Sequence, residues 1–208
     1  MITPTLGNYI NSVSTEFEQI PEDRKSVLQR IAHFVTHKIK AGEDANLILI
    51  CTHNSRRSHL SQVWTQVAAY HYGIRNVYSY SGGTEATALF PSAAHALTAA
   101  GLDIKVLSEG KNPIYSIKYA KSQHPIIGFS KTYDDTFNPQ SGFAAIMTCS
   151  HADVNCPMIP TAHERIALPF DDPKAFDGTP QQEEKYQERC RDIARELLYA
   201  FSLVKALI

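Results

Sequence analysis

The chain has 208 residues, of which 43% are hydrophobic and 20% are charged, and its formal net charge is −1 at pH 7. These are ordinary values for a globular protein of one domain, or of one domain with an extension. They exclude the basic excess typical of nucleic-acid binding, and no apolar run is long enough to span a membrane. The start of the chain lacks the pattern of a signal peptide, so we expect a cytoplasmic protein whose four cysteines are thiols or transient disulfides.

Two amphipathic helices are predicted in residues 1–44, on either side of Pro21. Apolar residues recur there at steps of three and four: Leu6, Ile10, Val13 and Phe17, then Val27, Leu28, Ile31, Phe34, Val35 and Ile39. Apolar stripes of this size need a partner, either the rest of the chain or a second copy in a homodimer. We favour packing within the chain and interpret residues 1–44 as an N-terminal helical extension of a domain at 45–208.

From residue 45 onward, strand-like and helix-like patterns alternate. They predict a strand at 45–50, a helix at 58–72, a strand at 76–81, a helix at 93–100, strands at 143–148 and 166–170, and a long helix at 180–207 capped by Thr179. Such alternation is typical of an α/β fold with a doubly wound parallel sheet in three layers. In that fold the active site lies at the carboxyl ends of the strands.

Residues 108–142 are longer than a simple connection and are predicted to be an insertion near the active site. Four aromatic residues of the insertion are candidates for a role at the site: Tyr115, Tyr119, Phe129 and Tyr133. They either line an entrance to the site or anchor the loop to the body of the domain, and both interpretations stay open at the level of the sequence.

The segment between the first strand and the first long helix of this domain reads Cys-Thr-His-Asn-Ser-Arg-Arg-Ser, from Cys51 to Ser58. A loop that joins a strand to a helix N-terminus directs its backbone N–H groups at one spot, where a tetrahedral anion fits. A thiol in that position beside an arginine is acidified, so Cys51 is expected to be a thiolate nucleophile. The predicted oxyanion-binding residues are Thr52, His53, Asn54, Ser55, Arg56, Arg57 and Ser58.

Individual side chains of this loop have separate expected tasks. The planar fork of Arg57 matches two oxygens of the anion, and Ser58 can donate its hydroxyl to the sulfur of Cys51. Asn54 tolerates the left-handed backbone angles of a tight anion nest. The alternative is that Cys51 is a buried cysteine at a strand end and Arg57 a surface arginine, because short motifs often match without meaning. The preceding strand, the following helix and the serine together favour the anion loop.

This loop resembles the phosphate loop of low-molecular-weight protein tyrosine phosphatases and of their relatives, the thioredoxin-coupled arsenate reductases. The segment 80–84 is similar to the family's Ser-Ala-Gly-Thr segment, and Phe170-Asp171-Asp172-Pro173 resembles the Asp-Pro loop that carries the general acid. The resemblance implies that Asp172, directly before the proline, protonates the leaving group. The residues alone do not separate Asp172 from Asp171.

The segment 149–160 is similar to the redox segment of the arsenate reductases. The resemblance implies a relay of three catalytic cysteines, Cys51, Cys149 and Cys156, with no bound cofactor and with thioredoxin as the external reductant. The phosphatases instead usually keep a second cysteine at the position of Arg56 and two tyrosines after the Asp-Pro, where this chain has Lys174 and Ala175. These differences favour an arsenate reductase, acting on arsenate, over a phosphatase, acting on phosphate esters.

Three alternatives remain at this level. A phosphotyrosine phosphatase would use Cys51, Arg57 and Asp172 in the same way, through a phosphocysteine intermediate hydrolysed by water. A non-catalytic oxyanion sensor would bind the anion without turnover. A zinc site could be built from Cys149, His151, Cys156 and His163, but the close cysteine pairing of zinc motifs is lacking, so no metal is predicted.

The separation of Cys149 and Cys156 constrains the segment between them. In a regular helix their α-carbons would lie roughly 10 Å apart, whereas a disulfide needs about 4.4 to 6.8 Å. We therefore expect an ordered turn or helix in the reduced protein and a looped-out segment in the oxidised protein, a change of low cost because short helices are marginal in water. Amide hydrogen exchange should show weaker protection of residues 149–156 after oxidation, and equal protection in both redox states would contradict the relay.

Overall fold

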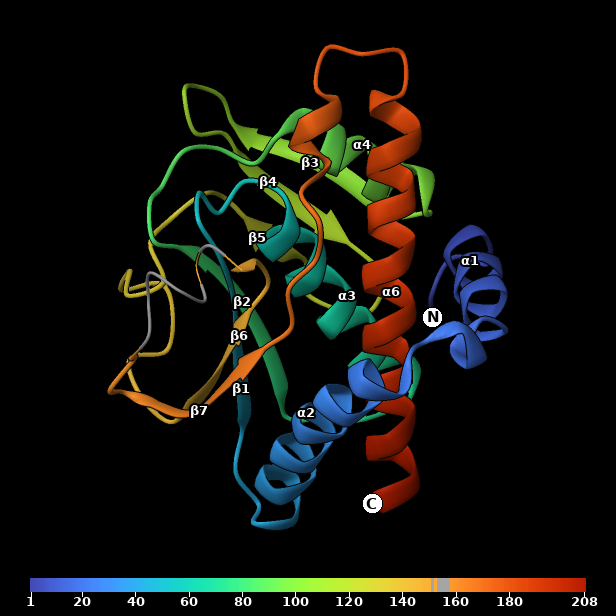
Figure 1. Cartoon of the computed structure of the whole chain (residues 1–208), viewed down its shortest axis with the longest axis vertical. Coiled ribbons are helices and arrows are strands. Elements are labelled where there is room, and N and C mark those ends of the chain that lie inside the picture. Colours follow the sequence, from blue (N-terminus) through green and yellow to red (C-terminus); the bar gives the residue numbers. More distant parts are fainter. Residues whose placement is uncertain (151, 153–157) are drawn as a thin grey trace.

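The computed structural model describes residues 1–150, 152 and 158–208. In this part of the chain, a four-stranded parallel sheet has the strand order β2–β1–β6–β7 (Figure 1). Its strands are β1 (Ala45–Cys51), β2 (Val77–Gly83), β6 (Phe143–Met147) and β7 (Ala162–Ala167). Because all pairs are parallel, the carboxyl ends of the strands meet at one edge of the sheet. The predicted α/β class with a parallel sheet is confirmed.

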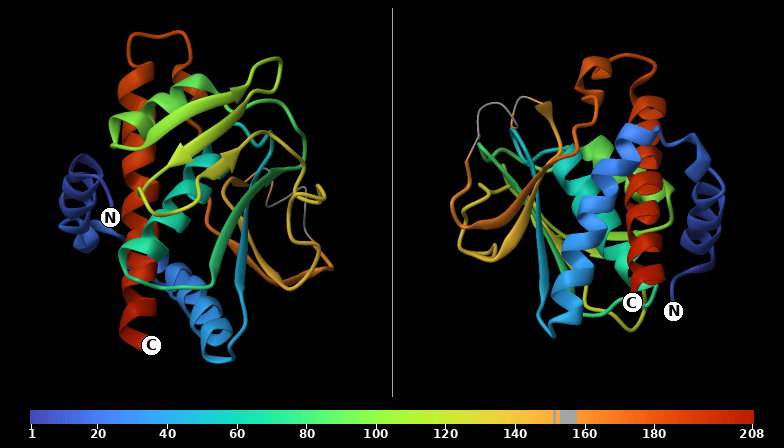
Figure 2. Two further views of the ribbon diagram at one scale, coloured as in Figure 1. Left: turned by 180° about the vertical axis from the view of Figure 1, so that it is seen from behind. Right: turned by 60° about the horizontal axis from the view of Figure 1, so that its bottom comes forward.

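Alternate side chains of β1 enter two different cores, as expected for a strand buried on both faces. Leu47 and Leu49 join the large core that the helices share, and Ile48 and Ile50 join a smaller core with Cys51 and Cys149. Helices α2 (Glu22–Lys40) and α3 (Arg57–His71) contact the sheet, and the long helix α6 (Gln182–Leu207) packs across both of them (Figure 2). Both of these cysteines therefore lie in the smaller core.

Residues 1–44, which we interpret as an N-terminal extension, contain α1 (Pro4–Ser14), the short helix η1 (Phe17–Gln19) and α2. Their apolar stripes are buried within the chain rather than in a homodimer contact; the buried residues include Leu6, Ile10, Val13, Leu28, Ile31, Phe34 and Val35. Helix α1 packs against α6, and α2 packs against α6, β1 and β7. No helix among the described residues combines the length and apolar character needed to cross a bilayer.

The predicted insertion contains most of a second sheet, which the sequence analysis did not predict. After α4 (Pro91–Ala99), strand β3 (Asp103–Ser108) pairs antiparallel with β4 (Ile114–Lys118), which pairs antiparallel with β5 (Ile126–Gly128). The strands are short, and β3 is mostly exposed, so no apolar run marked them. Tyr119 is buried in the large core and Tyr115 packs against it, which favours the anchoring interpretation for these two residues.

The clearest differences from the prediction concern strand β7 and the cap of helix α6. Strand β7 covers 162–167 rather than 166–170, because its half-exposed sequence Ala-His-Glu-Arg-Ile-Ala is more polar than a buried strand. The segment that follows stays attached to β6 and leads to the site: the Phe170 N–H donates to the Thr148 carbonyl at 3.1 Å. Helix α6 is capped at Gln181 without a side-chain bond, so Thr179 is not its cap. The Thr179 hydroxyl donates to the Phe176 carbonyl at 2.8 Å and accepts from the Gln181 N–H at 3.3 Å.

Gly101, which ends α4, also determines how closely α1 approaches. Its φ is +103°, and a Cβ placed there would lie 2.6 Å from the backbone N of Leu6. We expect Gly101→Ala to lower the free energy of unfolding by about 2 kcal/mol or more, because positive φ and a backbone clash act together. The matched control is Gly7→Ala within α1, where a Cβ meets nothing within 4 Å; it should stabilise by roughly 0.5–1 kcal/mol. Denaturant unfolding measures both, and equal effects would contradict this account.

Candidate active site

A chain of hydrogen bonds converges on the sulfur of Cys51, the last residue of β1. The Sγ atom lies 3.1 Å from Ser58 Oγ in the first turn of α3. Ser58 Oγ in turn accepts from the Asn54 side-chain amide at 2.8 Å, which leaves its own hydrogen free to point at the sulfur. Asn54 has a φ of 43°, in the left-handed region. This arrangement allows the Ser58 hydroxyl to donate to the sulfur of Cys51.

The loop is supported from behind by β2 and by the segment that follows β5. The carbonyl of Thr52 accepts from the Glu85 N–H at 2.8 Å and from Thr84 Oγ1 at 3.1 Å. The side-chain oxygen of Asn54 accepts from the Lys131 N–H at 2.9 Å. A Cβ at Gly83 would lie 2.7 Å from the backbone N of Asn54, so the close approach requires glycine. The segment 80–84 therefore buttresses the loop.

The structure separates the two neighbouring aspartates. Arg57 Nη2 lies 2.5 Å from Asp172 Oδ2, and Arg57 Nη1 donates to the Phe170 carbonyl at 3.0 Å. The other carboxylate oxygen of Asp172 accepts from the Lys174 N–H at 3.1 Å and caps the short helix η2 (Pro173–Phe176). The side chain of Asp171 is 95% exposed and lies 3.5 Å from Arg189. Asp172 thus faces the loop, and Asp171 faces away from it.

Cys149 lies beside the loop, two residues after the end of β6, the strand next to β1. Its sulfur is 3.5 Å from Thr52 Oγ1 and accepts from the Ala152 N–H at 3.2 Å. The preceding Thr148 N–H donates to the Ile50 carbonyl at 2.7 Å, which continues the pairing of β6 with β1. Cys149 is 1% exposed. Two of the three predicted relay cysteines, Cys51 and Cys149, are therefore held at neighbouring strand ends.

The chain is similar in sequence to known arsenate reductases. No family model matches the chain. The solved thioredoxin-dependent arsenate reductase of Corynebacterium glutamicum is 19% identical, with a TM-score of 0.42 over 94% of this chain and 85% of that one. An arsenate reductase of Bacillus licheniformis is 29% identical over 160 residues, which cover 75% of this chain and 94% of that protein. An arsenate reductase of Staphylococcus aureus strain Newman is 30% identical over 128 residues, 61% of this chain and 77% of that protein.

The chain belongs to the arsenate reductase family. This membership confirms the resemblance predicted from the loop 51–58 and the segment 149–160. Two members of the predicted site, Cys156 and the alternative zinc ligand His151, lie outside the described residues. Within the described residues, no three His, Cys, Asp or Glu side chains are grouped so that they could hold a metal ion.

One member of the predicted oxyanion set directs its charge elsewhere. The guanidinium of Arg56 bonds Asp177 at 2.6 Å and Tyr186 Oη at 2.5 Å, and it lies 4.1 Å above the centre of the Phe90 ring. Its charge is therefore engaged by a carboxylate rather than presented to an oxyanion. Sequence reasoning missed Asp177 and Tyr186, because neither forms a local motif with the loop.

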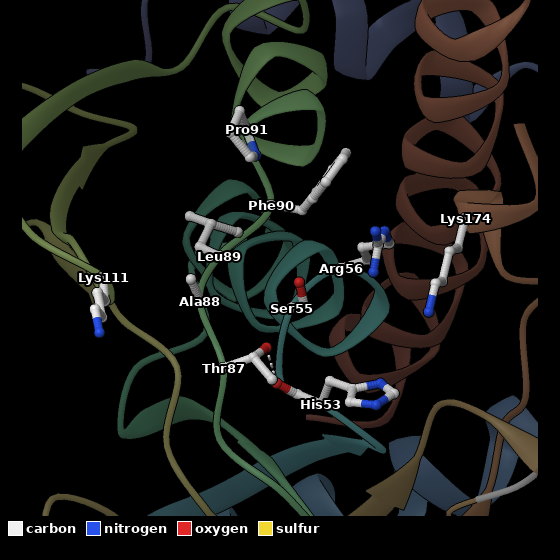
Figure 3. A pocket seen from close by; sticks show the side chains of 10 residues that line it. All are labelled: His53, Ser55, Arg56, Thr87, Ala88, Leu89, Phe90, Pro91, Lys111 and Lys174. Atoms are coloured by element: carbon white, nitrogen blue, oxygen red, sulfur yellow. Dashed lines mark hydrogen bonds between the residues drawn. The ribbon is translucent and has the colours of Figure 1, made fainter. Parts of the chain in front are cut away.

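A cavity of about 450 Å³ opens beside this family's phosphate loop. Figure 3 shows Ser55 and Thr87 near its centre, with Lys111 and Lys174 on opposite sides. Among the described residues, the lining includes four basic and no acidic side chains. These lining residues are His53, Ser55, Arg56, Thr87, Ala88, Leu89, Phe90, Pro91, Lys111 and Lys174. The side chain of His53 is half-exposed, and its ring lies 3.8 Å from the carboxylate of Glu85. Lys111 and Lys174 thus add positive charge to the approach to the loop, whereas the charge of Arg56 is paired with Asp177.

Cys190, to which the sequence assigns no role, is buried in the large core. Its sulfur accepts from the Trp64 indole N–H at 3.2 Å. Burial raises the pKa of the Cys190 thiol to about 12, so this sulfur stays protonated at neutral pH and is a poor nucleophile. It has the character of a packing residue.

His59, the third residue of α3, is fully buried, and its Nδ1 atom lies 3.3 Å from Ser81 Oγ. Burial, together with the nearby positive charge of Lys131, lowers the pKa of His59 to about 3. The unfolded chain would bind a proton at this residue below about pH 6.5, whereas the folded chain would not. Stability from this residue is therefore full above pH 6.5 and is lost as the pH falls towards 3.

Replacement of His59 by glutamine tests this linkage. Wild-type unfolding free energy should fall with decreasing pH more steeply than that of His59→Gln, by up to about 1.4 kcal/mol per pH unit below pH 6. Chemical unfolding of both proteins between pH 5 and pH 8 measures the two slopes. Parallel pH profiles would show that His59 takes up a proton equally well in the folded protein.

Proposed function

We propose that this protein is an arsenate reductase, with the catalytic domain at 45–208 and the extension 1–44 packed against it. The observation that carries the proposal is the pair of buried cysteines at adjacent strand ends. Cys51 has a serine donor at 3.1 Å, and Cys149 lies 3.5 Å from the side chain of Thr52, the residue after Cys51. A phosphatase needs the first cysteine alone, whereas a reductase needs a second thiol that can reach the first.

The first step is attack of the Cys51 thiolate on arsenic. A sulfur–arsenic bond forms, an arsenic–oxygen bond breaks, and Asp172 delivers the proton with which the departing hydroxide leaves as water. Arg57 and the loop amides hold the remaining oxygens. Arg57 is paired with Asp172 at 2.5 Å, so an oxyanion that takes the arginine fork displaces the carboxylate. Binding of the substrate therefore also frees the Asp172 carboxylate from Arg57.

The second step moves two electrons to arsenic. The Cys149 thiolate attacks the sulfur of Cys51, a disulfide forms between them, and the electron pair of the broken sulfur–arsenic bond stays on arsenic, which leaves as arsenite. Cys156, as the family resemblance implies, then attacks Cys149 and frees Cys51. The resulting disulfide between 149 and 156 is reduced by an external dithiol, for which we propose thioredoxin. No bound cofactor or metal takes part in this sequence.

Replacement of Cys149 separates the reductase from the phosphatase. Cys149→Ser should abolish multiple-turnover arsenate reduction, measured by NADPH oxidation with thioredoxin and its reductase, because the sulfur–arsenic bond then has no internal thiol to break it. Hydrolysis of p-nitrophenyl phosphate should stay within about threefold of wild type, since Cys51, Arg57 and Asp172 are unchanged.

The matched control is Cys190→Ala, which removes a buried cysteine from the large core and should keep arsenate turnover. Persistent arsenate turnover in Cys149→Ser would remove the reductase assignment. A wild-type protein that hydrolyses only the aryl phosphate would be a phosphatase instead. Binding of inorganic phosphate with no turnover of either substrate would identify an oxyanion sensor.

A further inference from the structure

Arg56 and Arg57, at the start of α3, form bonds to the two ends of the segment 170–177, which we call the acid loop. Arg57 bonds the Phe170 carbonyl and the Asp172 carboxylate, at the beginning of the loop. Arg56 bonds the Asp177 carboxylate, at its end. The residues between these contacts, 170–177, carry the aspartate to which the proposed function gives the role of acid. The oxyanion loop and the acid loop are therefore tied together by neighbouring residues.

The contacts at the far end form a closed triangle. Arg56 Nε donates to Tyr186 Oη at 2.5 Å, Arg56 Nη2 donates to Asp177 Oδ2 at 2.6 Å, and Tyr186 Oη donates to Asp177 Oδ1 at 2.6 Å. The ring of Phe90 stacks on that of Tyr186 with centres 5.6 Å apart, and it also lies under the Arg56 guanidinium. Each polar group thus has a partner in a buried setting, and such networks favour a single geometry.

The triangle is connected to Asp172 through η2. Asp177 is the residue that ends η2, and Asp172 is the residue that caps its start. Pro173 fixes the backbone between them, because its ring restricts φ. A four-residue helix held at both ends transmits the position of Asp177 to Asp172. Displacement of Asp177 therefore shifts the carboxylate of Asp172.

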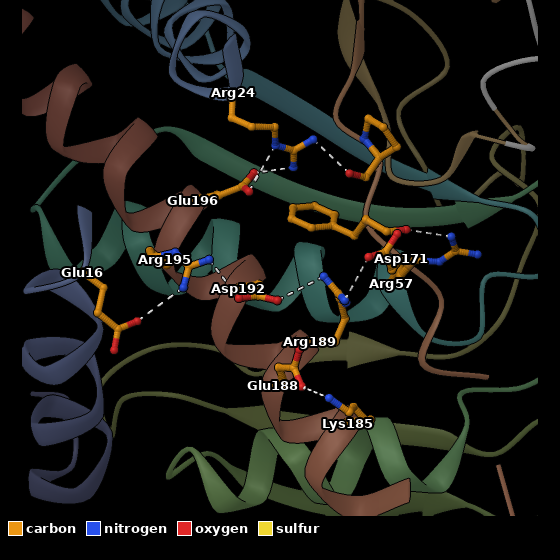
Figure 4. A network of polar contacts seen from close by, with 12 residues as sticks. Glu16, Arg24, Arg57, Asp171, Lys185, Glu188, Arg189, Asp192, Arg195 and Glu196 are labelled. Atoms are coloured by element: carbon orange, nitrogen blue, oxygen red, sulfur yellow. Dashed lines mark hydrogen bonds and ion pairs between the residues drawn. The ribbon is translucent and has the colours of Figure 1, made fainter. Parts of the chain in front are cut away.

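The other contacts of the loop cannot replace this one. Arg24 of α2 bonds the Pro169 carbonyl at 2.9 Å, before the loop begins its turn. Arg189 of α6 lies 3.5 Å from Asp171, whose exposed carboxylate makes a weak pair, as Figure 4 illustrates. Arg57 must give up Asp172 when its fork holds an oxyanion. The Arg56 contacts are then the ones that still join α3 to the side chains of the loop.

We propose that Arg56, Asp177 and Tyr186 form a positioning clamp for Asp172, and that this clamp holds the acid over the oxyanion loop while Arg57 is engaged with substrate. The proposal rests on the proposed function, in which Asp172 protonates the leaving oxygen. The three residues do not touch the reacting atoms. Their loss should slow the chemical step and leave oxyanion affinity nearly unchanged.

The test is a double-mutant cycle between Asp177→Asn and Asp172→Asn. Its readout is the rate of arsenite formation in a single turnover of the fully reduced protein, which needs no external reductant. Asp177→Asn should slow this step by about 10- to 100-fold, the effect of a misplacement of about 1 Å. Asp172→Asn should slow it by about 10²- to 10⁴-fold. The double variant should be no more than about threefold slower than Asp172→Asn, because the clamp acts through the acid.

Three further measurements separate positioning from general damage. The Kd for inorganic phosphate should change less than about threefold in Asp177→Asn, since Arg57 and the loop amides remain. Tyr186→Phe, which keeps the stack on Phe90, should slow the step less than Asp177→Asn does. The control Glu16→Gln removes ion pairs with Arg191 and Arg195 on the other side of α6; it should leave the rate unchanged.

A readout without activity follows the Lys174 amide, whose N–H is bonded to Asp172 Oδ1. Its hydrogen exchange should accelerate in Asp177→Asn and stay at the wild-type rate in Glu16→Gln. Additive rate effects in the cycle, or an unchanged Lys174 exchange rate in Asp177→Asn, would overturn the clamp. If the wild-type protein forms no arsenite, the reductase proposal fails by itself, and the Lys174 exchange still decides whether Asp177 positions Asp172.

Discussion

The parallel register of β1 with its two neighbours is the constraint on which the site depends. Ile50 pairs with Met147 on one side, and Cys51 pairs with Gly83 on the other. Because the strands run in the same direction, everything that follows them is delivered to one edge of the sheet. Cys149 arrives there two residues beyond Met147, and the glycine of β2 leaves room for the loop backbone. A slip of one residue would turn Cys51 to the opposite face of the sheet.

Arginine side chains from three helices hold the segment 169–177 in place at that edge of the sheet. Arg24 comes from α2, Arg56 and Arg57 from α3, and Arg189 from α6, and each contacts residues between 169 and 177. Arg24 also bonds the buried carboxylate of Glu196 on α6 and lies 4.9 Å from the centre of the Phe170 ring (Figure 4). Helix α2 therefore does more than cover the core, since its Arg24 side chain bonds the Pro169 carbonyl just before the acid loop.

Local features of this site could be predicted from sequence, and long-range ones could not. The strand, loop and helix around Cys51 follow from spacing over a short stretch, and so does the donor role of Ser58. Asp172 and Asp171 are chemically identical neighbours, and only the fold turns one towards Arg57. Arg56 meets Tyr186 across 130 positions of the chain, and no periodicity or short motif encodes such a contact. Strands β3 to β5 escaped prediction because they are short and partly exposed, so their residues lack a strong apolar pattern.

The residue at position 56 affects both the proposed cysteine relay and the position of the acid loop. The phosphatases that this loop resembles usually carry a cysteine there, and in the proposed relay such a thiol would compete with Cys149 for the sulfur of Cys51. Arginine removes that competitor, because its side chain cannot form a disulfide. The same substitution introduces a permanent positive charge, which must be paired when it is buried. Asp177 supplies the pair at 2.6 Å, and in doing so it fixes the end of the loop that carries Asp172. In the proposed mechanism, arginine at position 56 thus leaves Cys149 as the partner of Cys51, and its ion pair with Asp177 holds the end of the loop that carries the proposed acid.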